Sequence, residues 1–128
     1  MNKEQLAEEL ARMRGDRKID TLSSYAVRSI ETGGSSYPVS NLLKYCEALS
    51  VQMVMSDMVV DEHYPVDTMQ EVHEVLQMLM ERWDTDCAGI FRKAGVHYTP
   101  PKGNTGSLSI VTMLAMCSVL HCKLDFIK

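Results

Sequence analysis

The sequence lacks any apolar run long enough to cross a membrane. A spanning helix needs about 20 apolar residues, and the longest run, residues 110–120, is better interpreted as a buried helix. The N-terminus is charged and amphipathic, unlike a signal peptide. The four cysteines form no CxxC pair, and Cys46 and Cys117 fall on apolar helix faces, as is typical of small buried hydrophobes in a reducing compartment. We therefore expect a cytoplasmic protein that is not inserted in a membrane.

Catalytic and cofactor-binding motifs are also missing. The chain contains no GxSxG, P-loop, HExxH or dinucleotide fingerprint. Residues 61–63 and 117–122 hold side chains of metal-ligand type, but neither cluster has the paired spacing of a structural zinc site. We interpret the first cluster as a surface loop and the second as a helix end. No enzymatic activity, metal or cofactor is expected.

Acidic and basic residues are separated along the chain, within a formal net charge of -4. Residues 61–86 carry eight acids against Arg82 alone, whereas residues 87–128 carry five lysines and arginines against Asp125 alone. An acidic chain disfavours broad non-specific binding to nucleic acid, because phosphate contacts supply most of that affinity. The net charge does not exclude a local basic face, so charge alone does not decide the partner.

A stretch in the first half, residues 37–55, returns in altered form as residues 108–126. A shift of 71 positions aligns three identical pairs, Leu43 with Leu114, Cys46 with Cys117 and Leu49 with Leu120. Each copy predicts a helix with apolar residues three and four apart, followed by a few residues that alternate as in a strand. The predicted elements upstream also repeat in the same order. The sequence therefore predicts an internal duplication.

Apolar spacing and end signals predict the helices. We expect them near residues 3–14, 22–32, 38–50, 68–83, 85–94 and 109–121. Capping-box signals precede two of them, Asn2 with Gln5 and Asp67 with Gln70. Ser23 is the predicted N-cap of the second helix, inside a hydrophobic staple of Leu22 and Val27.

Strand signals are shorter. Residues 51–54 and 58–60 predict a hairpin that turns at Ser56 and Asp57, and residues 63–65 predict a break in the chain. Leu124 and Phe126 alternate as in a strand near the C-terminus. We expect the segments that follow the two repeated helices to pair with each other in one small sheet.

Residues 22–51 contain four short motifs whose order and spacing are informative. The pattern runs in the order Ile30-Glu31-Thr32-Gly33, Leu42-Leu43-Lys44, Ala48-Leu49 and Val51. It resembles the second half of the phage-repressor (Cro/C1-type, Xre) helix-turn-helix family, in which a recognition helix ends in Ile-Glu-x-Gly and a Leu-Leu-Lys helix follows. The resemblance implies a helix that lies in the major groove and reads bases from its first turns.

The same resemblance implies a set of DNA-facing residues at the start of the second predicted helix. They are Ser23, Ser24, Tyr25 and Arg28. Hydroxyl groups can bond phosphates or base edges, and Arg28 could bind a guanine through two hydrogen bonds. Lys18 is expected to contact phosphate, whereas Glu31 is expected to be structural.

The second half departs further from the family. Residues 90–95 stand where its recognition helix would end, but they lack the Ile-Glu pair. Arg92, Lys93 and Lys102 place positive charge beside the following loop. We keep all three as candidate DNA-binding residues, although a solvated basic edge is the more common meaning of such a cluster.

The expected fold is mainly α, with two helix-turn-helix modules in tandem and a small β element after each repeated helix. The first module takes residues 1–60, and the diverged second module, residues 61–128, packs on it. The expected function is sequence-specific binding of double-stranded DNA as a transcriptional regulator. The alternative is a protein-protein interaction module of the same fold that has lost DNA binding, because only residues 16–22 stand where the family has a full supporting helix.

The sequence also predicts an oligomeric state. A face rich in Met and Leu on residues 75–80, together with a strand edge at residues 123–127, offers apolar surface that a small monomer would struggle to cover. This pattern predicts a homodimer. A tandem repeat that forms its own pseudo-dimer within one chain is the other interpretation.

Overall fold

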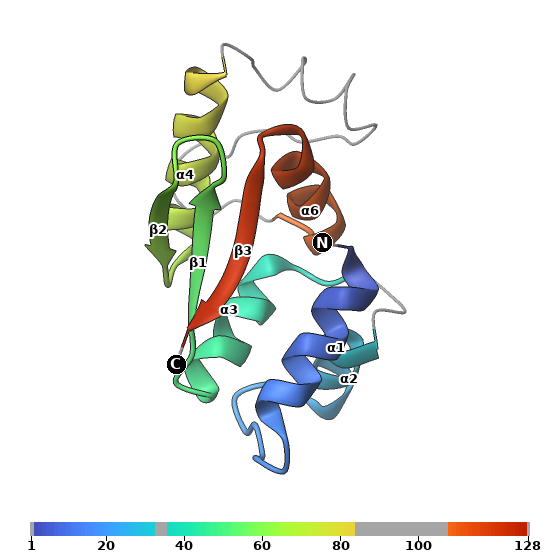
Figure 1. Cartoon of the computed structure of the whole chain (residues 1–128). Coiled ribbons are helices and arrows are strands. Elements are labelled where there is room, and N and C mark those ends of the chain that lie inside the picture. Colours follow the sequence, from blue (N-terminus) through green and yellow to red (C-terminus); the bar gives the residue numbers. More distant parts are fainter. Residues whose placement is uncertain (1, 33–35, 84–107, 128) are drawn as a thin grey trace.

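The computed structural model describes residues 2–32, 36–83 and 108–127 (Figure 1). Three helices come first, then two strands and a long helix, and finally a helix and a strand. Their bounds are α1 (Lys3–Arg14), α2 (Ser24–Thr32), α3 (Val39–Ala48), β1 (Gln52–Asp57), β2 (Glu62–Val66), α4 (Met69–Arg82), α6 (Ile110–Val119) and β3 (Cys122–Ile127). Among the described residues, no helix combines the length and the apolar character needed to cross a membrane.

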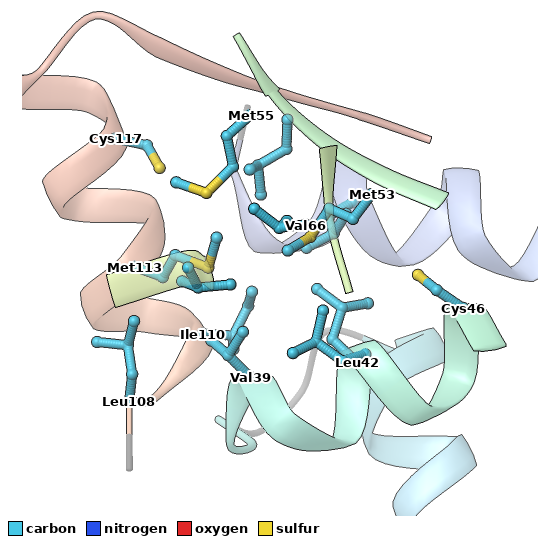
Figure 2. Packing of buried hydrophobic residues seen from close by; sticks show 14 of the residues in the cluster. Val39, Leu42, Cys46, Met53, Met55, Val66, Leu108, Ile110, Met113 and Cys117 are labelled. Atoms are coloured by element: carbon cyan, nitrogen blue, oxygen red, sulfur yellow. The ribbon is translucent and has the colours of Figure 1, made fainter. Parts of the chain in front are cut away.

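The three strands form one antiparallel sheet in the order β2-β1-β3. β1 is central, so it pairs with its neighbour in sequence, β2, and with β3 from the far end of the chain. Figure 2 shows how the strands and two helices share the core. The labelled side chains that meet there include Met53, Met55 and Val66 of the sheet, Val39 and Leu42 of α3, and Ile110 and Met113 of α6.

The pairing of β1 with β3 matches the predicted internal repeat. Val54 lies opposite Asp125, and Pro38 forms an isolated antiparallel bridge with Ser109. Both partners are 71 positions apart, which is the shift that aligns the two halves of the sequence. The bridge has two reciprocal hydrogen bonds, from Val39 N–H to the Leu108 carbonyl (2.7 Å) and from Ile110 N–H to the Tyr37 carbonyl (2.8 Å). Equivalent positions therefore meet each other, as they do across a two-fold axis.

Helix contacts obey the same relationship. α1 packs against α6, and α4 packs against α3. A single hydrophobic cluster takes residues from all of the described helices and strands, including Leu10 of α1, Leu76 of α4 and Leu124 of β3. The expected pairing of the segments after the repeated helices is confirmed by the register of β1 and β3. The division of the chain at residue 60 stays a prediction.

The prediction of a mainly α chain built from helix-turn-helix modules is wrong. The structure is mixed α/β, with a three-stranded antiparallel sheet at its centre. Residues 15–23, where the family has its supporting helix, form turns and extended chain instead. A helix of two turns takes about seven residues, and this segment must also reverse the chain direction between α1 and α2. The segment is too short to do both.

The predicted hairpin was also misplaced. β1 continues through Ser56 and Asp57, and the turn falls on residues 58–61. The Asp57 carboxylate orders this turn, since it accepts hydrogen bonds from the N–H groups of Val59 (2.9 Å) and Val60 (3.4 Å). Residues 63–65, predicted to break the chain, instead belong to β2. Pro65 is tolerated there because β2 is an edge strand of the sheet.

Candidate nucleic-acid interface

The start of α2 has the local geometry that the sequence predicts. The Ser23 hydroxyl accepts a hydrogen bond from Ala26 N–H at 3.1 Å, which confirms Ser23 as the N-cap. Leu22 and Val27, the predicted staple, are both half-buried against the core. Because both ends of this turn are held, the direction in which α2 leaves the loop is defined.

Four of the sequence-predicted site residues share one outward face of this helix. Ser23, Ser24, Tyr25 and Arg28 are all exposed, and the Tyr25 side chain reaches 76% exposure. The opposite face is buried through Ser29 and Ile30. The structure thus brings the predicted residues of the first half together at the surface, without any of them being needed for the core.

α2 is held from behind by an ionic network. Glu31 accepts hydrogen bonds from Arg14 Nε (2.5 Å) and Nη2 (2.9 Å), which together form a bidentate ion pair with α1. The Tyr45 hydroxyl of α3 lies 2.5 Å from Glu31 Oε2 and 2.9 Å from the Leu10 carbonyl oxygen. Glu31 therefore has the structural role expected of it, because it joins three helices.

The network also fixes the charges of its members. Burial alone would raise the pKa of Glu31, but the hydrogen bonds from Arg14 and Tyr45 outweigh it and lower that pKa. The hydrogen bond to Glu31 raises the pKa of Arg14, and burial raises the pKa of Tyr45. At neutral pH the network is therefore a carboxylate, a guanidinium and a neutral phenol.

A surface groove of about 480 Å³ runs between α2 and the loop after α1. Lys18 and Arg28 are among its lining residues, with Asp20 as the acid that is not engaged by Arg14. The charges of Arg14 and Glu31 cancel, so the groove carries a net charge of about +1 from Lys18, Arg28 and Asp20. A positive groove beside an exposed helix start can accept a phosphate group.

The remaining expectations concern three basic residues and two clusters of metal-ligand type. Arg92, Lys93 and Lys102 lie outside the described residues. In the two clusters that contain side chains of metal-ligand type, His63 Nδ1 is hydrogen-bonded to Ser56 Oγ (2.8 Å), and the His121 ring lies 5.0 Å from that of Trp83. Among the described residues, no group of three or more His, Cys, Asp or Glu side chains could hold a metal ion.

Sequence reasoning missed Arg14 and Tyr45, the residues that position α2. In the sequence, Arg14 is an ordinary basic residue in the last turn of α1, and Tyr45 is one of several apolar residues of α3. Nothing local connects them, because Arg14 lies 17 and Tyr45 lies 14 positions from Glu31. The available signal was Glu31 itself. A carboxylate with a structural role needs hydrogen-bond donors around it.

Comparison with known proteins does not extend this picture. No protein-family model, curated protein or solved structure matches the chain. The function has to be argued from the surface of α2.

Proposed function

We propose that this protein is a sequence-specific, DNA-binding transcriptional regulator that reads the major groove with α2. The single observation that carries the proposal is the outward face of this helix. Ser23, Ser24, Tyr25 and Arg28 stand together there, beside Lys18 in the adjoining groove. These are the residue types that bond phosphates and base edges at the start of a recognition helix.

The contacts that hold α2 in place favour base-specific binding over non-specific binding to the phosphate backbone. A helix distinguishes bases only when its side chains are held in a fixed position relative to the duplex. The Arg14–Glu31–Tyr45 network ties α2 to α1 and α3. Arg28 lies one turn from Ser24 and carries a guanidinium, which matches the O6 and N7 acceptors of guanine. Lys18 would contact a neighbouring phosphate.

A separate observation favours a second candidate function. The loop at residues 15–23 replaces the supporting helix of the phage-repressor family, and the most exposed residue of the α2 face is an aromatic one, Tyr25. Exposed tyrosines are enriched in protein-protein interfaces. A protein-interaction module that has lost DNA binding is therefore the second candidate function.

Selection from a random duplex library separates the two. The full chain is incubated with the library at low salt, bound duplexes are amplified, and enriched sequences are tested by fluorescence anisotropy at two salt concentrations. The DNA proposal expects an enriched motif whose affinity falls as salt rises, because phosphate contacts release counterions. No binding to any duplex at low salt would end the DNA proposal and leave the interaction module.

A further inference from the structure

The C-terminal ends of the two repeated helices share their backbone angles at the cap, with φ -95° at Leu49 and -89° at Leu120. After α3, Ser50 takes a left-handed conformation with φ 54°, and the chain closes with two hydrogen bonds. Val51 N–H donates to the Cys46 carbonyl (2.9 Å), and Ser50 N–H donates to the Glu47 carbonyl (3.1 Å). This is the Schellman motif, in which the side chain three residues before the cap contacts the side chain two residues after it. Cys46 and Val51 occupy those two positions.

The end of α6 takes the same backbone angles with a different pair of residues. His121 takes the left-handed conformation with φ 55°, at the position 71 residues after Ser50. The two contacting positions of the motif are then Cys117 and Cys122. The motif therefore places two thiols against each other, where the first half has a thiol against an isopropyl group.

The two thiols differ in their surroundings. Cys117 is buried at 4% exposure, whereas Cys122 is half-buried, and both line a cavity of about 570 Å³. A hydrogen bond from the Cys117 thiol lowers the pKa of Cys122, and the backbone N–H of Ser56 adds to this. The same hydrogen bond, together with burial, raises the pKa of Cys117. Cys122 is thus the thiol with the greater exposure and the lower pKa, the two features of a nucleophilic cysteine.

We propose that Cys117 and Cys122 form a peroxide-reactive dithiol that closes to an intramolecular disulfide. The Cys122 thiolate attacks one oxygen of hydrogen peroxide; an S–O bond forms, the O–O bond breaks, and the departing hydroxide takes up a proton to give water. The Cys117 sulfur then attacks the sulfenic sulfur of Cys122, and the hydroxyl leaves with the Cys117 proton as a second water. Two thiols are oxidised, and one peroxide is reduced to two waters.

Access and geometry both allow the reaction. The cavity that the thiols line is bordered by the exposed side chains of Met58 and Val59, so a molecule as small as hydrogen peroxide can reach Cys122. The two residues lie at opposite ends of one turn and line the same cavity, which is the placement that an intramolecular disulfide requires. Cys46 is the internal reference, because it has the same backbone position and burial as Cys117 but no second thiol beside it.

Peptide mapping after peroxide treatment tests the proposal. A Cys87→Ser background leaves Cys46, Cys117 and Cys122 as the cysteines of the chain. Trypsin releases Cys117 and Cys122 on one peptide, residues 103–123, and Cys46 on another, residues 45–82. After peroxide, peptide 103–123 should lose the mass of two hydrogen atoms and take up no alkyl groups until a reductant is added. Cys46 should stay open to alkylation once the protein is unfolded.

Three variants assign the roles. Cys117→Ser should stop at a sulfenic acid on Cys122, which a dimedone-type reagent traps, and Cys122→Ser should leave Cys117 as a thiol. Val51→Cys should transfer the reaction to the first half and produce a disulfide on peptide 45–82. A peptide 103–123 that still takes two alkyl groups after peroxide, or that links only to other chains, would overturn the proposal. This readout needs no substitution at either thiol, so a variant that fails to fold does not affect it.

Discussion

The Tyr45 hydroxyl of α3 lies 2.5 Å from the Glu31 carboxylate of α2. Arg14 of α1 bonds both oxygens of the same carboxylate, so a single half-buried acid joins the first three helices. An acid that is partly withdrawn from water in this way stabilises a protein only when its oxygens are paired. The face of α2 that we propose to read DNA is therefore oriented by residues that DNA would not touch.

Removal of the Tyr45 hydroxyl should destabilise the protein. Tyr45→Phe leaves one Glu31 oxygen and the Leu10 carbonyl without this donor, at a cost of about 1–3 kcal/mol in the free energy of unfolding. Urea denaturation measures the effect. Tyr25→Phe is the matched control, because its side chain is 76% exposed, and it should change the free energy by less than about 0.5 kcal/mol. Equal effects of the two substitutions would contradict the network.

A fully buried acid, Asp57, predicts how stability depends on pH. Burial alone would raise the pKa of Asp57, but the N–H of Val59, the Arg82 guanidinium and the N–H of Val60 outweigh it and hold that pKa below its ordinary 3.8. A carboxyl group whose pKa is lowered by folding stabilises the native state above its unfolded pKa. This contribution is lost as the pH falls through the lowered, folded-state pKa.

Asp57→Asn should therefore flatten the acid limb of the stability curve. Free energies of unfolding, measured by urea denaturation from neutral pH down to about pH 3, should fall less steeply for the variant than for the wild type. At neutral pH the variant should be less stable, because the Arg82 ion pair is lost. Asp61→Asn, whose side chain is 92% exposed, is the control and should reproduce the wild-type curve. An unchanged acid limb in Asp57→Asn would refute the assignment.

Substitutions on the α2 face should separate base reading from phosphate contact. On a selected duplex, Arg28→Ala should cost about 1–3 kcal/mol and relax the choice of base at one position. Lys18→Ala should weaken binding to all duplexes and reduce the salt slope by about one unit. Anisotropy titrations at several salt concentrations measure both effects. The roles would be wrong if Arg28→Ala weakened every duplex equally or Lys18→Ala changed the preferred motif.

The homodimer stays a prediction that a mass measurement decides. Multi-angle light scattering at concentrations well above micromolar should give twice the chain mass of 14.4 kDa if two copies associate. An exposed apolar side chain at Ile127 of the outer strand β3 supports this expectation. A mass of 14.4 kDa would contradict it, and would leave the paired halves of one chain as the only two-fold arrangement.

The described helices are the part of this fold that the sequence by itself determined, whereas the helix expected near residues 85–94 lies outside the described residues. The capping box of Asn2 with Gln5 and the N-cap at Ser23 are both present. Each depends on hydrogen bonds between residues three positions apart, so the signal is complete within one turn of chain. Even where the prediction erred, the error was small: α4 is capped by Thr68 with Glu71, one residue after the predicted Asp67 and Gln70.

The tertiary structure decided the sheet, the turn at residues 58–61 and the support of α2. β1 ends where it does because β3 pairs with it across some 70 residues of chain and Asp57 orders the following turn. Glu31 becomes a junction because packing brings Arg14 and Tyr45 to it from two other helices. Strand pairing and buried ion pairs depend on partners that are distant in sequence, and only the packed chain selects them.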